Sequence, residues 1–107
     1  MEAFVQVVTT TETKADAEKI ANTLVEARLA GCAQLLGPIV STYWWKDKME
    51  TAQEWLCVMK THQGLYDDVE KIIKTLHPYE TPEIIAMPIV EGSRDYFQWL
   101  REVLKPC

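Results

Sequence analysis

Two kinds of hydrophobic pattern alternate along the chain. Short β-branched or aromatic runs, typical of strands, are separated by stretches in which apolar residues recur every three or four positions, which is typical of amphipathic helices. The pattern therefore predicts, in order, a strand over 3–9, a helix over 13–30, a long hairpin over 32–62, a helix over 65–76, a strand over 82–90 and a last helix after Ser93.

Local signals mark the ends of these elements. Thr13 with Asp16 resembles a capping box at the start of the first helix, and Gly31 is expected to end that helix in a left-handed conformation. Within the hairpin, Pro38 cannot donate a ladder hydrogen bond, so we expect a bulge at Gly37-Pro38.

The order β-α-β-β-α-β is that of the split βαβ, or ferredoxin-like, arrangement. This α+β fold has an antiparallel four-stranded sheet with both crossover helices on one face, here followed by a C-terminal helix. A chain of 107 residues is the size of one domain, so we assign residues 1–107 to a single unit that needs no cofactor to fold.

The long hairpin is unusually aromatic. It carries Tyr43, Trp44, Trp45 and Trp55, and neighbouring residues on a strand point to opposite faces of the sheet. Helices on one face cannot cover both Trp44 and Trp45, so we expect at least one ring to meet another subunit.

Charge and composition exclude several classes of function. The net charge is −5 and the basic residues are scattered, which argues against a nucleic-acid partner. No apolar stretch approaches the length of a membrane span, and the first residues lack a basic signal-peptide region. Three cysteines without CxxC spacing indicate neither a disulfide framework nor a zinc knuckle, so we expect a cytoplasmic protein.

The segment 77–83 is the best candidate for chemistry. It places His77, Tyr79, Glu80 and Glu83 between two prolines, and nitrogen and oxygen donors of this kind suit divalent cations such as copper or zinc. The alternative is structural: His77 ends a helix with its ring on the last carbonyls, and Glu83 pairs with a strand neighbour.

Lys60 is the second candidate, because it ends an otherwise apolar strand and needs a carboxylate or an exit to water. We expect a pair with Glu80 or Glu83, and a pocket for an anion or small ligand that Lys60 forms with Tyr79 and a hairpin tryptophan. The alternative is an edge lysine that discourages strand addition. An enzyme with His77 as general base and Lys60 as electrostatic stabiliser is a third hypothesis, although no nucleophilic triad or phosphate loop is present.

Several strings in the sequence resemble the divalent-cation tolerance, or CutA, family. They are ARLAGCAQ at 27–34, STYWW at 41–45, KT at 60–61, HPYETPEI at 77–84 and PIVEGSRDYFQWL at 88–100. The resemblance implies a homotrimer similar to the PII signalling proteins, joined edge to edge through the long hairpin. It also implies metal tolerance and copper binding in bacteria, and a link to acetylcholinesterase anchoring in mammals.

Carried over by position, the family pattern marks Cys32, Tyr43, Trp45, Lys60, His77, Tyr79, Glu80, Glu83, Tyr96 and Trp99. Of these, His77 and Cys32 are the candidate metal ligands. The candidate ligand-binding residues are Lys60, Tyr79, Glu80, Glu83, Tyr43, Trp45 and Trp99. This chain departs from the pattern at Gln34 and Asp47, and it has Thr9 and Leu76 where some copper-binding members carry Cys and His. Those two losses argue against tight binding of a soft metal.

The sequence thus predicts a cytoplasmic homotrimer, not an enzyme, that binds a divalent cation of the copper class or a small anionic ligand in clefts between subunits. The alternative is a PII-like interaction module in which metal binding is incidental.

Overall fold

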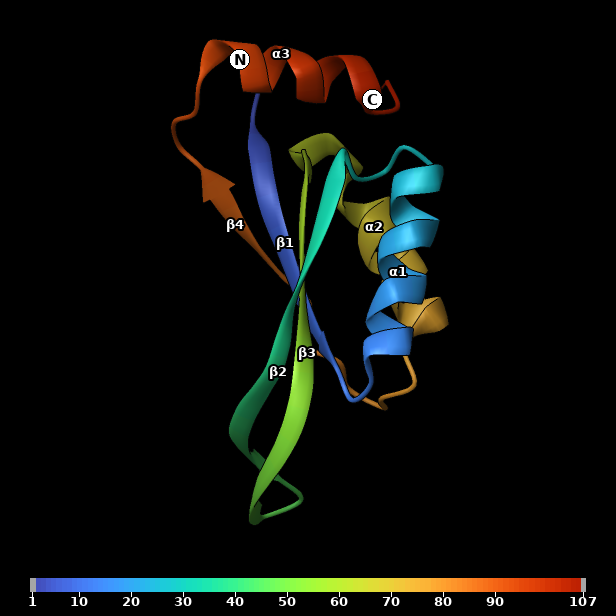
Figure 1. Cartoon of the computed structure of the whole chain (residues 1–107), viewed down its shortest axis with the longest axis vertical. Helices are drawn as coiled ribbons and strands as arrows, with labels where there is room; N and C mark the ends of the chain where they lie inside the picture. Colours follow the sequence, from blue (N-terminus) through green and yellow to red (C-terminus); the bar gives the residue numbers. More distant parts are fainter. Residues whose placement is uncertain (1, 107) are drawn as a thin grey trace.

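A computed structural model describes residues 2–106, and its four strands and three α-helices follow the predicted order (Figure 1). The elements are β1 (Phe4–Thr11), α1 (Lys14–Glu26), β2 (Cys32–Trp45), β3 (Lys48–His62), a short 3-10 turn (Gln63–Leu65), α2 (Tyr66–Leu76), β4 (Ile85–Ile89) and α3 (Arg94–Val103). The strands form one antiparallel sheet in the order β2-β3-β1-β4, which confirms the α+β fold expected from the sequence.

Helices α1 and α2 lie side by side on one face of this sheet (Figure 1). Their apolar stripes bury Ile20, Leu24 and Ile73 completely against Val7 and Met59 of the central strands. Burial of such side chains is worth ~2 kcal/mol each, so this layer holds the fold together.

Helix α3 crosses one end of the sheet, beside the start of β1 (Figure 1). Its Phe97 ring stacks on Phe4 at a centroid distance of 4.9 Å, and its Leu100 is fully buried. A Cβ at Gly31 would lie 2.5 Å from the Leu100 side chain, so the chain entering β2 can pass this close only with glycine.

The β2–β3 hairpin projects past the other strands at the opposite end of the molecule (Figure 1). Pairing continues to Trp45 and Lys48, and the turn residues Lys46 and Asp47 have φ values of 50° and 64°, as a tight hairpin turn requires. The ladder is irregular between Leu36 and Ile39, which confirms the expected bulge.

The end of the first helix differs from the prediction. Helix α1 stops at Glu26, and the left-handed residue is Arg28 (φ 60°), not Gly31. The amide of Leu29 then donates to the carbonyl of Leu24, which closes the helix end locally. Gly31 has no positive φ, and its amide donates to Lys60 O instead.

Apolar side chains remain exposed on both edge strands of the sheet. On β2, Val40 is 76% and Trp44 73% exposed, and beside β4 Val90 is 87% exposed. Trp44 is therefore largely uncovered within the protomer, and the expected contact of a hairpin tryptophan with another subunit stays a prediction. Among residues 2–106, no helix combines the length and the apolar character needed to cross a membrane. Cys107 lies outside the described residues.

Candidate functional site

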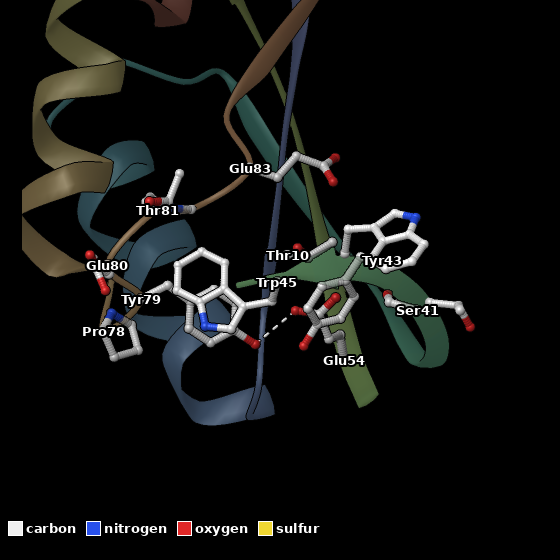
Figure 2. Close-up of a pocket in the computed structure, with 13 residues that line it drawn as sticks. Thr10, Ser41, Tyr43, Trp45, Glu54, Pro78, Tyr79, Glu80, Thr81 and Glu83 are labelled. Atoms are coloured by element: carbon white, nitrogen blue, oxygen red, sulfur yellow. Dashed lines mark hydrogen bonds between the residues drawn. The ribbon is translucent and has the colours of Figure 1, made fainter. Parts of the chain in front are cut away.

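A cavity of about 920 Å³ opens between the β2–β3 hairpin and the segment that joins α2 to β4 (Figure 2). The hairpin projects beyond the sheet on one side, and the proline-bounded segment after α2 forms the other wall. The lining residues are Thr10, Ser41, Thr42, Tyr43, Trp44, Trp45, Glu54, Pro78, Tyr79, Glu80, Thr81, Pro82 and Glu83. Five of the predicted ligand-binding residues thus share one cleft: Tyr43, Trp45, Tyr79, Glu80 and Glu83.

Glu54 on β3 is the most buried acid of the cleft, with only 5% of its surface exposed. Its Oε2 accepts a hydrogen bond of 2.7 Å from the Tyr79 hydroxyl, drawn as a dashed line in Figure 2. Burial and this hydrogen bond raise the pKa of Tyr79 well above its usual value, so the phenol stays protonated as the donor. The Oε1 atom of Glu54 has no hydrogen-bond partner among residues 2–106.

The cleft is acidic and aromatic. Three carboxylates line it, and no lysine, arginine or histidine of the described chain does. Rings from Tyr43, Trp44 and Trp45 form the hairpin side, and the Lys46 ammonium lies 5.5 Å from the centre of the Trp45 ring. An environment of carboxylates and π-faces favours positive charge.

His77 is buried behind the cleft wall and uses both ring nitrogens. Nδ1 accepts from the Tyr79 amide at 3.2 Å, so the proton is on Nε2, which donates to Thr10 O at 2.7 Å. In this arrangement both ring nitrogens of His77 are engaged, so the ring has no free lone pair for a metal. The expectation of His77 as a metal ligand is therefore corrected. The structural alternative also needs correction, because the carbonyl that His77 contacts belongs to β1 and not to the preceding helix.

Lys60 lies at the other end of β3. It is six residues from Glu54 along the strand, about 20 Å at ~3.3 Å per residue. Its Nζ donates to Gln34 Oε1, so the predicted pair with Glu80 or Glu83 is not formed within the protomer, and Lys60 does not line the cleft. Within one protomer, the expected pocket of Lys60 with Tyr79 is therefore not formed.

Cys32, Tyr96 and Trp99 gather at that same far end. Cys32 Sγ lies 3.3 Å from Tyr96 Oη, and the Tyr96 and Trp99 rings are 5.6 Å apart. Cys32 pairs with Lys60 in the sheet register. Cys32 and His77 thus lie at opposite ends of the sheet, and no group of three His, Cys, Asp or Glu side chains within residues 2–106 is placed to hold a metal.

Sequence reasoning missed Glu54 and Thr10. Glu54 directly precedes the apolar run 55–59, and a carboxylate at the edge of a buried strand is a signal that could have drawn attention to it. Thr10 contributes its backbone carbonyl to His77, and no side-chain pattern reports such a role.

Comparison with known proteins gives a consistent result. Residues 5–103 match the family model described as CutA1 divalent ion tolerance protein. The chain is 43% identical to the divalent-cation tolerance protein CutA of Thermus thermophilus over 86 residues, which cover 80% of this chain and 84% of that protein. It is 41% identical to the human protein CutA over 87 residues, 81% of this chain, but spans about half (49%) of the human protein's length.

Solved structures share the fold. The crystal structure of CutA1 from Oryza sativa superposes with a TM-score of 0.95 at 31% identity, covering 98% of this chain and 96% of the other.

Proposed function

Because the chain belongs to the CutA1 divalent ion tolerance family, we propose that it binds divalent cations, and that the acidic aromatic cleft between hairpin and segment 78–83 is where they bind. We further propose that the working form is a homotrimer in the cytoplasm.

One observation carries the assignment of the cleft. Its wall holds Glu54, Glu80 and Glu83 with no basic residue, so the local field attracts cations and repels anions. The anionic ligand considered from the sequence relied on Lys60, which lies at the other end of β3.

The donor atoms indicate which cations to expect. The cleft offers carboxylate, hydroxyl and carbonyl oxygens, and ions bound through one or two carboxylates keep part of their water shell. The cavity volume accommodates such a hydrated ion. Among first-row divalent ions, Cu²⁺ should bind most strongly, since it leads the affinity order for N and O donors.

Exposed apolar surface on both sheet edges supports self-association. Val40 and Trp44 on β2, and Ile85 and Met87 on β4, are each at least 40% exposed. Edge strands with such side chains favour pairing with another copy of the chain. Lys60 and Trp99 lie at the far end of the sheet and do not line this cleft.

Titration calorimetry with Cu²⁺ and Zn²⁺ tests the cleft. We expect Glu54→Gln to weaken binding by about tenfold, because it removes the buried charge. Glu18→Gln, an equal change of charge on an exposed position of α1, should have no effect. Equal affinities in the two variants would overturn the proposal.

We propose a binding role rather than catalysis. The enzyme hypothesis required His77 as a base beside Lys60, but the two side chains contact different ends of the sheet, and His77 has both nitrogens engaged.

A PII-like interaction module is the second candidate, and the hairpin tip favours it. Trp44 and Met49 form an exposed cross-strand pair there, 73% and 68% accessible. A partner captured only when residues 44–50 are intact, whether or not a chelator is present, would support this role over cation binding.

A further inference from the structure

The carboxylates of the cleft do not gather around one point. Figure 2 shows Glu54 at the hairpin side, Glu80 on the opposite wall and Glu83 apart from both. In residues 2–106 no three His, Cys, Asp or Glu side chains are grouped closely enough to hold a dehydrated metal ion together. Dispersed carboxylates suit a cation whose charges are themselves dispersed.

The walls between these carboxylates are aromatic. Tyr43, Trp44, Trp45 and Tyr79 all contribute to the lining. A small hydrated metal ion makes little use of such rings, whereas alkyl chains pack on them and ammonium groups interact with their π-faces. The chain's own Lys46 illustrates this preference, since its ammonium lies 5.5 Å from the Trp45 ring centre.

Glu54 supplies an open position for a hydrogen-bond donor. Its side chain is 95% buried, Oε2 is engaged by Tyr79, and Oε1 has no partner in the described chain. Because Oε1 is not among the buried unpartnered atoms, it reaches the cleft surface, where a cationic N–H donor can bind it. An alkylammonium group supplies both the positive charge and the N–H donor for Glu54 Oε1.

We propose that the cleft binds an alkyl polyamine, with one ammonium group on Glu54 Oε1, the methylene chain along Tyr43 and Trp45, and further ammonium groups near Glu80 and Glu83. This proposal rests on the proposed function, because it takes the same cleft as the cation-binding site, and it names the class of cation. It adds that the rings, and not only the carboxylates, select the ligand.

Calorimetry with spermidine at physiological ionic strength tests this, with 1,6-hexanediol as an uncharged probe of similar shape. We expect spermidine to bind and the diol not to bind. Glu54→Gln should weaken spermidine binding by about tenfold or more, and Glu18→Gln should leave it unchanged. No binding of spermidine, or equal binding by the two variants, would overturn the proposal.

Trp45→Leu separates the two proposals and provides a second variant if Glu54→Gln does not fold. It removes a ring and no charge, so it should weaken spermidine binding several-fold and leave Cu²⁺ binding unchanged. Unchanged spermidine binding in this variant would refute the role of the aromatic wall. If Cu²⁺ binds in the cleft and spermidine does not, the polyamine proposal alone fails. If Cu²⁺ does not bind there, the proposed function fails.

Discussion

The hydrogen bond between Tyr79 and Glu54 gives the sharpest test of the cleft's construction. Tyr79→Phe removes only the hydroxyl that donates to Glu54 Oε2 at 2.7 Å. Because the Glu54 side chain is 5% exposed, water cannot freely replace the lost donor. Removing the donor to a buried charged acceptor costs about 1.5–3 kcal/mol, so we expect the free energy of unfolding to fall by about that amount.

The chain contains its own control for this substitution. Tyr66 on α2 donates to Glu70 at 2.9 Å through the same chemistry, but that glutamate side chain is 38% exposed. Tyr66→Phe should therefore cost clearly less than Tyr79→Phe, since water can hydrate the released carboxylate.

Denaturant unfolding at one fixed protein concentration measures both variants, because self-association makes apparent stability depend on concentration. Equal losses for Tyr66→Phe and Tyr79→Phe would refute the reasoning that burial of Glu54 sets the cost. A loss for Tyr79→Phe that persists in the Glu54→Met background, which has no acceptor for the hydroxyl, would show that the cost comes from elsewhere in the loop.

Three further outcomes are expected. His77→Ala should lower the free energy of unfolding by about 2 kcal/mol or more in the presence of a chelator, since two buried hydrogen bonds are lost. The same variant should bind Cu²⁺ with an affinity within about twofold of wild type. A loss of Cu²⁺ affinity without a loss of stability would restore His77 as a ligand. Burial raises the pKa of the Cys57 thiol from 9.0 to about 11, so the stability that the neutral thiol contributes is intact below pH 9. About 2–3 kcal/mol of it is lost as the pH rises from 9 to 11. The free energy of unfolding should therefore fall less steeply with pH in Cys57→Ala than in wild type, and equal slopes would contradict this. Trp44→Ala should shift sedimentation toward smaller species, because it removes a ring that is 73% exposed in the protomer, and an unchanged oligomer would exclude this ring from the interface.

The fold could be predicted because its signals are local. Period-2 and period-3.6 patterns, the Thr13 cap and the Gly37-Pro38 break report on neighbouring residues, and the structure places strands and helices in the expected order. The end of α1 was misplaced because Arg28, an ordinary residue, adopts the left-handed conformation expected of Gly31.

The site could be predicted only in part. Tyr43, Trp45, Tyr79, Glu80 and Glu83 do share a cleft, since the hairpin and the proline-bounded segment form opposite walls. The sequence could not show that the strand register carries Lys60 to the far end of the sheet.

The hydrogen-bond partners of polar side chains also could not be predicted from the sequence. The role of Glu54 depends on contact with a segment 25 residues away, and that of His77 on a carbonyl 67 residues away. No local pattern encodes such distances, so a ligand role and a structural role for His77 could be told apart only from the structure.

The location of a bound cation tests the central claim most directly. Crystals of the protein soaked with Cu²⁺ and measured at the copper absorption edge should show an anomalous peak inside the cleft, next to Glu54, Glu80 or Glu83. A peak at Cys32, or one coordinated by a rotated His77 with the cleft empty, would contradict the account.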